Sequence, residues 1–563
     1  MISRRDFLTA AAATAILTGS GGGRLARLAA QQSLTERDIL AFEPLGNVTL
    51  VHLTDIHAQL VPIHFREPSI NIGVGSAKGR VPHITGAAFR KQFGIADKSA
   101  EAFALTYDDF ASLAANYGRM GGLDRIAAVV KAIRAERGNN MLLLDGGDTW
   151  SGSWTTLQTK GQDMVDVMAA LKPDAMTGHW EFTLGDARVK ELTDKLGFPF
   201  LAQNVRDSEF EDRVFPAQQM FERGGVKVAV IGQAFPFTPI ANPRWMMPKW
   251  TFGIREADLQ KEVDDARAAG AGLVVLLSHN GFDVDVKVAE VVKGIDVILS
   301  GHTHDAVPQP TLIGKTIIVA TGSNGKFVSR LDLDVRDGGL KGYRYRLIPV
   351  FADAIKPDAE TSAIIERHRA PFAKDLGRVL GKTDTVLYRR GNFNGTFDNV
   401  ICDAILKQRD AEIALSPGIR WGTSVLPGQD ITFEDVTNAT ALTYPACYRM
   451  AMNGKRLKEV LEDVADNIFN PDPFYQQGGD MVRTGGLGYT IDVSKPIGQR
   501  ISGMTLLGSG KTIEAEKDYV VAGWASINQG TEGPPIWDVV AKHIEDAKVV
   551  APREADAVKV LGT

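Results

Sequence analysis

The chain has 563 residues, a formal net charge of −5 and two cysteines, Cys402 and Cys447. This length can bury large hydrophobic cores, and a composition of 44% hydrophobic and 23% charged residues fits a globular protein of about two domains. The slightly acidic balance excludes the basic surface of a nucleic-acid-binding protein. Two cysteines exclude a disulfide-rich scaffold. Their spacing leaves pairing open, and we expect two buried thiols.

The N-terminus carries the features of an export signal. Arg4 and Arg5 precede an apolar run that extends to Leu17. The run is too short to span a bilayer, and the two arginines ahead of it are typical of a twin-arginine signal peptide. We assign residues 1–30 to this signal. The mature protein is then expected to be periplasmic, soluble, monomeric and free of the membrane.

Residues 45–350 alternate apolar strands with amphipathic helices, among them 123–137 and 257–269, which predicts an α/β layered domain. A long insert at 62–118 interrupts it and carries His83 among other polar and aromatic residues. Insertions of this length are usually functional or disordered. We expect this one to be ordered around the mouth of an active site.

The remainder of the chain forms a second unit. Residues 357–380 are predicted to form a linker helix, and residues 381–563 a smaller C-terminal domain. This domain has a strand-like run at 448–452, a helical pattern at 456–464 and several glycine-rich loops. The sequence therefore predicts a catalytic domain followed by a substrate-binding domain.

Polar motifs follow five apolar segments of the first domain. The most informative is Ser300-Gly301-His302-Thr303-His304, directly after the apolar run 297–299. The other four motifs begin at Asp55, Asp145, Gly178 and Ser278, and they carry His57, Asp148, His179 and His279. Because open sheets bind ligands outside the carboxyl ends of their strands, the five motifs are expected to meet at one site.

Carboxylate and imidazole ligands bind divalent first-row metals. Asp55, His57 and His304 can hold one ion. His179, His279 and His302 can hold a second, and Asp148 can bridge the two because a carboxylate has two oxygens. A pair of such ions promotes displacement at a tetrahedral centre. Each motif alone also fits a helix cap or a structural histidine, and only the set of five indicates a metal centre.

The motifs Asp-x-His, Gly-Gly-Asp, Ser-His-Asn and Gly-His-Thr-His, in this order, resemble the calcineurin-like metallophosphoesterases. Asn399-Val-Ile-Cys-Asp-Ala404 and Gly418-Ile-Arg420 resemble the second domain of the 5'-nucleotidase family. The resemblance covers nearly the whole mature chain. It implies a four-layer αββα metallophosphoesterase-like domain and a smaller α/β 5'-nucleotidase-like domain.

Three departures bear on the substrate. Nucleotidases have Gly-Asn-His-Glu, in which Asn binds metal and His assists catalysis, whereas this chain has Gly178-His179-Trp180-Glu181. Pro534 stands where nucleotidases have a base-stacking aromatic residue. An asparagine of the nucleotidase motif is lost ahead of Gly418, while Arg420 remains. The anion-binding arginine is therefore kept, and the base-binding pocket is not.

With the long insert and the export signal, this combination resembles the SoxB family of thiosulfohydrolases in bacterial sulfur oxidation. That family releases sulfate from a cysteine S-thiosulfonate on the C-terminal arm of the SoxYZ carrier protein and leaves a persulfide. The resemblance implies two manganese ions, whereas the ligands alone fit zinc or iron equally well. Asn204, Arg420 and Trp180 are the expected substrate contacts. Glu181 is expected either to orient a metal ligand or only to begin a helix.

Two other functions fit parts of the pattern. One is a periplasmic 5'-nucleotidase or another dinuclear-metal phosphoesterase, against which Trp180 and Pro534 argue. The other is a non-catalytic metal-binding protein, which the complete ligand set disfavours.

Overall fold

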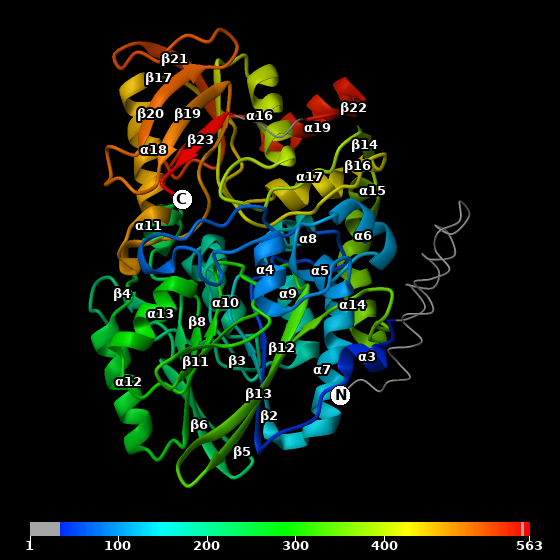
Figure 1. Ribbon diagram of the computed structural model, residues 1–563, viewed down its shortest axis with the longest axis vertical. Helices are drawn as coiled ribbons and strands as arrows, with labels where there is room; N and C mark the ends of the chain where they lie inside the picture. The colour runs from blue at the N-terminus through cyan, green and yellow to red at the C-terminus, as the bar shows by residue number, and fades with distance from the viewer. Residues whose placement is uncertain (1–33, 553–556) are drawn as a thin grey trace.

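The computed structural model describes residues 34–552 and 557–563, so the predicted signal peptide lies outside the described residues. The chain forms a lower lobe, coloured blue to green, and an upper lobe, coloured yellow to red (Figure 1). A short N-terminal helix, α3 (Glu36–Leu40), packs beside the lower lobe. Every strand that precedes a predicted metal ligand belongs to the lower lobe.

Two sheets form the centre of the lower lobe. One has the order β13-β12-β1-β2-β3, and the other has the order β10-β11-β9-β8-β6-β5. The first consists of β13 (Gly339–Pro349), β12 (Phe327–Arg336), β1 (Val48–Leu53), β2 (Met141–Asp145) and β3 (Ala175–Met176). The second consists of β10 (Thr311–Ile313), β11 (Thr316–Ala320), β9 (Val297–Ser300), β8 (Leu273–Ser278), β6 (Val226–Gln233) and β5 (Gln218–Arg223). A separate pair joins β4 (Arg206–Asp207) to β7 (Trp250–Thr251).

Side-chain alternation makes these sheets a sandwich. On β8, Val275 and Leu277 enter the core between the two sheets, whereas Val274 and Leu276 enter the core beneath the outer helices. Strand side chains point alternately to opposite faces, so a strand that is apolar at every position must be covered on both sides. Both faces of the central strands are therefore buried, as their unbroken apolar runs predict.

Helices cover the two outer faces. The lower-lobe helices are α7 (Leu123–Arg137), α8 (Trp154–Thr159), α9 (Gln162–Leu171), α10 (Asp186–Thr193), α11 (Thr238–Ala241), α12 (Glu256–Ala268) and α13 (Phe282–Val291). Residues of α7 and α9 share a core with β1 and β2, and residues of α12 and α13 share a core with β8 and β9. This is the predicted four-layer αββα arrangement. The helices expected at 123–137 and 257–269 are confirmed.

Residues 62–118 are folded and lie where the two lobes meet (Figure 1). They contain α4 (Gly86–Phe93), α5 (Ala100–Leu105) and α6 (Phe110–Tyr117). The backbone N–H of Ile72 donates to Asn392 Oδ1 in the upper lobe (2.7 Å), and Asn71 Nδ2 donates to Asp305 Oδ1 in the lower lobe (3.1 Å). The insert therefore contacts both lobes.

The chain passes to the upper lobe through α14 (Ala359–Arg369) and α15 (Ala373–Leu376), where a single helix was expected. A short 3-10 turn at Ala370–Phe372, with a proline in its first turn, separates the two, because proline lacks the amide hydrogen that a helix interior needs. The next element is β14 (Val379–Thr383).

In its described residues, the upper lobe packs three small sheets with four helices. Its sheets have the orders β16-β14-β22, β17-β21-β15-β18 and β20-β19-β23. Their strands are β15 (Ile413–Ser416), β16 (Asp430–Thr432), β17 (Tyr448–Asn453), β18 (Arg483–Gly485), β19 (Leu487–Asp492), β20 (Ile501–Leu506), β21 (Asp518–Gly523), β22 (Val549–Val550) and β23 (Val558–Leu561). The helices are α16 (Thr396–Gln408), α17 (Phe433–Thr440), α18 (Gly454–Phe469) and α19 (Ile536–Ala547). Cys402 and Cys447 are free and buried, as expected.

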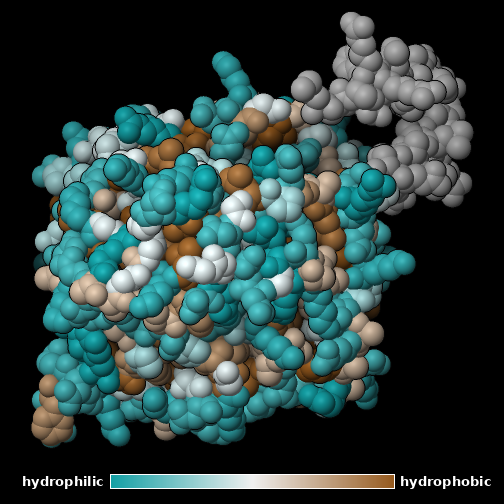
Figure 2. Space-filling model, turned by 90° about the horizontal axis from the view of Figure 1, so that it is seen from below, coloured by the Kyte–Doolittle hydropathy of each residue, from teal (hydrophilic) through white to brown (hydrophobic). Residues whose placement is uncertain are grey.

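Seen from below, the surface is mainly hydrophilic, and its hydrophobic residues form scattered patches (Figure 2). No helix within the described ranges is both long and apolar enough to cross a membrane.

A buried ion pair fixes the insert to the catalytic sheets. Lys326, one residue before β12, has a side chain that is 1% exposed and is paired with Glu67 of the insert. Its ammonium also donates to the carbonyl oxygens of Ala104 (2.8 Å) and Phe65 (3.3 Å). Burial lowers the pKa of Lys326, and the Glu67 carboxylate opposes this shift. These three hydrogen-bond partners lie in the insert.

We expect Glu67→Gln to lower the free energy of unfolding by about 3 kcal/mol, because it leaves a buried ammonium without its counter-charge. Urea unfolding followed by circular dichroism measures this change. The double variant Glu67→Leu/Lys326→Met should recover most of the loss. Asp265→Asn, which breaks the exposed pair with Lys261, is the matched control and should change stability by less than about 0.5 kcal/mol. Equal effects of Glu67→Gln and Asp265→Asn would contradict the role of the buried pair.

Candidate metal centre

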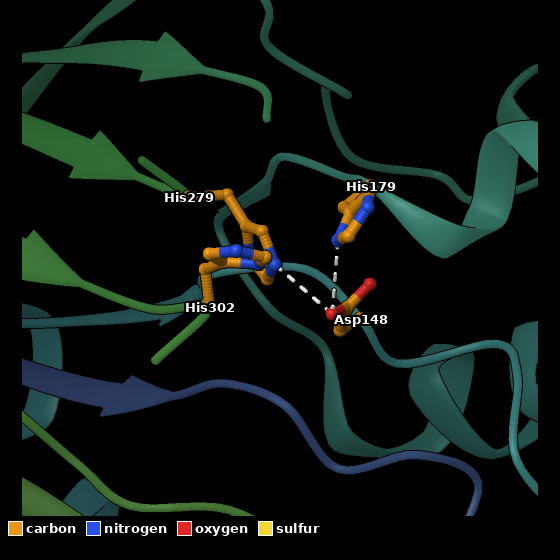
Figure 3. A group of neighbouring side chains, drawn as sticks. All are labelled: Asp148, His179, His279 and His302. Atoms are coloured by element: carbon orange, nitrogen blue, oxygen red, sulfur yellow. Dashed lines mark hydrogen bonds and ion pairs between the residues drawn. The ribbon is translucent and has the colours of Figure 1, made fainter. Parts of the chain in front are cut away.

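The predicted ligands meet at one edge of the sandwich. Strands β1, β2 and β3 are parallel to one another, and so are β8 and β9, so the loops that follow them leave their sheets at the same end. Two groups of side chains form there, each with ligand atoms within 4.8 Å of one another. One group is Asp55, His57, Asp148 and His304, and the other is Asp148, His179, His279 and His302 (Figure 3). All seven predicted ligands are thus brought together, and both groups share Asp148.

In the first group the imidazoles converge on a carboxylate. His57 Nε2 lies 3.0 Å from His304 Nε2, and His304 Nε2 lies 3.2 Å from Asp55 Oδ1. His57 Nε2 is also 3.8 Å from Asp148 Oδ2. One face of the His57 ring stacks on Trp421, with ring centroids 4.3 Å apart. This stacking fixes the plane of the imidazole and leaves its Nε2 edge facing the group.

In the second group each histidine ring has one nitrogen close to an oxygen atom outside the group. His279 Nε2 lies 3.0 Å from Asp148 Oδ2, and its Nδ1 is 2.6 Å from the carbonyl oxygen of Gly146. His179 Nδ1 lies 3.2 Å from the same carboxylate oxygen (Figure 3).

The ring nitrogens on the far side are also engaged. His179 Nε2 lies 3.2 Å from Asn242 Oδ1, and His302 Nε2 is 2.9 Å from the carbonyl oxygen of Gln477. An acceptor at one ring nitrogen places the hydrogen there and leaves the other nitrogen free for a cation.

The ligand loops have an unusual backbone. Five of the seven ligands have positive φ: Asp55 (51°), His57 (50°), Asp148 (56°), His302 (76°) and His304 (61°). Residues other than glycine rarely adopt this left-handed region of backbone conformation, and such backbone strain is typical of functional sites. The N–H groups of Asp55 and His57 donate to the carbonyl oxygens of Gly147 (2.8 Å) and Asp148 (2.9 Å). These bonds hold the loops after β1 and β2 against each other.

A glycine is required where the loop after β9 passes the loop after β1. A Cβ on Gly301 would lie 2.4 Å from Thr54 Oγ1 and 3.1 Å from Asp55 Oδ2. Any side chain there would displace the carboxylate, which also accepts the N–H of His302 (3.0 Å).

Burial and charge set the protonation of the ligands. Burial would raise the pKa of Asp148, but His179 and His279 hold it well below its ordinary value. Burial lowers the pKa of His57 to about 3 and that of His302 far below its ordinary value. His279 is the exception, because burial, which would lower its pKa, is outweighed by Asp148 and Asp55, which together raise it to about 10. The shared carboxylate is therefore ionised and two imidazoles carry free electron pairs at neutral pH.

This donor set fits divalent first-row cations. The buried nitrogens His57 Nδ1, His302 Nδ1 and His304 Nδ1 have no hydrogen-bond partner among the described residues. Two buried carboxylates beside five imidazoles match the nitrogen and oxygen ligands of zinc, iron and manganese sites. Unpaired buried nitrogens are costly, and cations would satisfy those that face the carboxylates.

Glu181 accepts backbone hydrogen bonds around the site. Its carboxylate receives the N–H groups of Thr149 (2.6 Å), His179 (2.8 Å), Trp150 (3.2 Å) and Asp148 (3.3 Å). Burial raises its pKa, and the charge of Asp148 adds to the shift. The carboxylate thereby joins the loop after β2 to the loop after β3. This geometry favours the expectation that Glu181 orients a ligand.

Asn204 does not face the ligands with a free amide, which corrects its expected role as a substrate contact. Its Nδ2 donates to the carbonyl oxygens of Ala234 (2.8 Å) and Gly253 (2.9 Å), and its Oδ1 accepts the N–H of Ala234 (2.9 Å). Phe235, the residue after Ala234, packs on the rings of His179 and His302, with centroids 4.0 and 4.2 Å away. Asn204 thus positions an aromatic support for two ligands.

Both the backbone and the ring of Trp180 make contacts at the edge of the site. Its N–H donates to Asp148 Oδ1 (2.8 Å). Its indole meets Trp421 edge-on at 5.0 Å and lies parallel to Tyr444 at 6.2 Å. Trp421 in turn stacks on the ring of His57. Trp180 therefore supports His57 indirectly, through Trp421. It does not line the cavity described next.

A cavity opens beside His302. Arg420, Gly478 and His302 line it together with Asn71, Ile72 and His83 of the insert. Arg420 is buried, with Nη2 donating to the carbonyl oxygen of Gly479 and Nε 3.4 Å from Asp480 Oδ1. Its Nη1 has no partner among the described residues. A fixed guanidinium with one free donor edge is suited to an anion.

Three supporting residues escaped the sequence analysis. Asn242 and Phe235 follow β6, a strand with neither Asp nor His at its end. Trp421 directly follows Arg420, and only its position next to a recognised motif could have drawn attention to it.

Residues 48–306 match the calcineurin-like phosphoesterase family, and residues 379–541 match the C-terminal domain of 5'-nucleotidases. The solved structure of the sulfate thiohydrolase SoxB from Thermus thermophilus, in complex with glycerol, is similar to this chain with a TM-score of 0.89 and 36% identity. The similarity covers 93% of this chain and 98% of that chain. The chain belongs to the SoxB family.

Similarity to nucleotidases is more distant. A snake venom 5'-nucleotidase from Naja atra is 26% identical over 435 residues, which are 69% of this chain and 79% of that protein. A 5'-nucleotidase precursor from Thermus thermophilus shares the fold, with a TM-score of 0.73 and 22% identity over 92% of this chain and 100% of that chain. This SoxB-family chain is thus a member of the metal-dependent hydrolases that share the phosphoesterase and nucleotidase domains.

We expect the wild-type SoxB-family protein to contain close to two metal ions per chain and Asp148→Ala to lose at least one. The physical reason is that Asp148 belongs to both ligand groups. Metal analysis of protein purified without added metals measures both values. Asp283→Asn, at a carboxylate outside both groups, is the control and should keep the wild-type content. A single ion in the wild type, unchanged by Asp148→Ala, would contradict the shared ligand.

Proposed function

We propose that this protein is a thiosulfohydrolase that releases sulfate from a cysteine S-thiosulfonate on the SoxYZ carrier protein. The observation that carries the proposal is the pair His179-Trp180, which stands where nucleotidases have Asn-His. His179 lies in the ligand group and Trp180 lies beside it, so the catalytic histidine of nucleotidases has no counterpart there. The similarity to the SoxB structure over 93% of the chain supports the same conclusion.

The chemistry suits a substrate with a good leaving group. Water adds to the sulfonate sulfur, the bond between this sulfur and the neighbouring sulfur of the carrier breaks, and its electron pair stays on the carrier as a persulfide. Sulfate leaves, and the protons of the water pass to the solvent. A persulfide is weakly basic, so its departure needs no protonating histidine. This accounts for a tryptophan at position 180.

The side chains of this chain supply binding and orientation. Arg420 Nη1 is free to donate to a sulfonate oxygen, because its other nitrogens are occupied by Gly479 and Asp480. Gly146, Asn242 and Gln477 fix the rings of His279, His179 and His302. Two ions held by Asp55, Asp148 and the five histidines would polarise the sulfonate oxygens and activate the attacking water. We propose manganese for both sites, on the basis of the family resemblance.

A nucleotide substrate is disfavoured by the upper lobe. Pro534, at the position of an aromatic ring in nucleotidases, accepts the N–H of Cys447 through its carbonyl oxygen (2.9 Å). Its saturated ring offers no aromatic face on which a base could stack.

The deciding experiment incubates the metal-loaded protein with thiosulfonate-loaded carrier and, separately, with AMP. Sulfate from the first and no phosphate from the second is expected, and the reverse result would refute the proposal. Trp180→Ala should reduce sulfate release at least tenfold, because it removes the support of Trp421 behind His57. Both metals should remain bound, since the backbone N–H that donates to Asp148 is retained.

Trp180→His should also reduce sulfate release without creating efficient AMP hydrolysis, because the asparagine ligand and the aromatic clamp of nucleotidases are still missing. Phe210→Ala removes an aromatic ring that is 71% exposed and serves as the control. High AMP hydrolysis by Trp180→His would mean that the pocket is built for nucleotides.

We also propose that the protein is exported by the twin-arginine pathway after metal loading in the cytoplasm. Divalent copper and zinc bind such ligands more tightly than manganese at equilibrium, so folding where they are scarce would protect the choice of metal. Replacing Arg4 and Arg5 by lysine should leave active, metal-loaded protein inside the cell. Fractionation with metal analysis tests this, and finding only metal-free protein there would count against it.

A further inference from the structure

A histidine of the insert faces the cavity beside His302 without any role in the metal ligand groups. His83 Nε2 lies 2.9 Å from Asp283 Oδ2 at the start of α13, and the two side chains are 13% and 16% exposed. The other ring nitrogen, Nδ1, is buried and has no hydrogen-bond partner in the part of the chain that the structure describes. An unpaired buried donor or acceptor is costly, which suggests that a bound molecule completes the arrangement.

The position of His83 connects it to the cationic wall of the cavity. His83, Asp283, Arg420 and His302 all line the same cavity. Arg420 also has an unpartnered nitrogen, Nη1. Gly73 packs on the other side of the imidazole, where a Cβ would lie 2.6 Å from His83 Cγ. The ring is therefore held in place by Gly73 on one side and Asp283 on the other.

The groups around His83 favour its charged form. Burial alone would lower the pKa of His83, but the hydrogen bond and charge of Asp283, together with the charge of Asp305, raise it, against a smaller opposing effect of Arg420. Asp305 itself accepts a hydrogen bond from Asn71 (3.1 Å) and lies 3.6 Å from Arg390, so its own charge is partly balanced. A protonated His83 would present Nδ1–H as a second donor in the cavity.

We propose that His83, held by Asp283, is a second anion-binding side chain of the cavity and acts with Arg420 on a tetrahedral oxyanion. This inference rests on the proposed function for the identity of the anion, which is the sulfonate of the substrate or the sulfate product. The insert then contributes directly to substrate recognition through His83. The alternative is that His83 has a purely structural role, in which its contact with Asp283 joins the insert to α13. The experiment must distinguish this role from anion binding.

The probe is inorganic sulfate, and the measurement is its dissociation constant for the metal-loaded full chain by calorimetry at several pH values. Because the pKa of His83 is raised, the imidazole is charged below that pKa and sulfate affinity is lost as pH rises through it. We expect His83→Gln to weaken sulfate binding about tenfold at pH 6.5, as loss of a charge-assisted hydrogen bond implies. The affinity difference between the wild type and His83→Gln should disappear at high pH.

Asp283→Asn keeps an acceptor for His83 Nε2 and so keeps the contact between the insert and α13. It removes the negative charge that stabilises the imidazolium form of His83. It should bind sulfate nearly as well as the wild type at low pH and lose affinity at a lower pH than the wild type does. The matched control is His368→Gln. His368 Nε2 lies 2.8 Å from Asp166 Oδ2, with side chains 15% and 33% exposed, and this pair joins α14 to α9 outside the cavity. It should leave sulfate binding unchanged.

Wild-type affinity and pH dependence in His83→Gln, with metal content intact, would overturn the inference, and so would the absence of any sulfate binding by the wild type. An unshifted pH dependence in Asp283→Asn would count against it as well. The outcome is independent of the assay with loaded carrier. If that assay yields no sulfate while sulfate binding still depends on His83, the anion site stands and only the proposed substrate fails.

Discussion

The strained backbone of the ligand loops is the constraint on which the rest of the structure depends. Five of the seven candidate ligands have left-handed φ values, and each such residue is less stable than in an ordinary loop by on the order of 1 kcal/mol. What offsets this cost is a set of contacts between the loops. Asp55 and His57 donate to the loop that carries Asp148, and Glu181 collects four N–H groups from the loops after β2 and β3. The ligand geometry is therefore a property of the loops as a set.

The supports behind the ligands come from more distant parts of the chain. Asn242 holds His179, Phe235 lies against two ligand rings, and Trp421 of the upper lobe stacks on His57. The insert is anchored by the ion pair between its Glu67 and Lys326, and it lines part of the cavity beside His302. The insert and both lobes therefore line the cavity beside His302 together.

The sequence predicted the two stacked sheets and the seven side chains that gather in the two groups, because each prediction rests on a local pattern. An apolar run followed by Asp or His at its carboxyl end, as at β1 and β9, contains both the strand and the ligand. Asn204 was wrongly taken as a substrate contact, because nothing in its neighbourhood shows that its amide is used by Ala234 and Gly253. Asn242 and the pair of His83 with Asp283 could not be predicted, since each contact joins segments that are far apart in sequence. The backbone N–H of Trp180 donates to Asp148, but its ring meets Trp421 and does not line the cavity of Arg420.

The contact between His302 and the upper lobe couples two equilibria. His302 Nε2 lies 2.9 Å from the carbonyl oxygen of Gln477, and a Cβ on the following Gly478 would lie 2.5 Å from the same nitrogen, so only a glycine permits this approach. A ligand from one lobe is thereby oriented by the backbone of the other. Any hinge motion that separates the lobes must release this ring and weaken its hold on a cation. By thermodynamic reciprocity, a cation bound to His302 favours the closed arrangement of the lobes by the same free energy. A cation at His302 would then stabilise the contact between the two lobes.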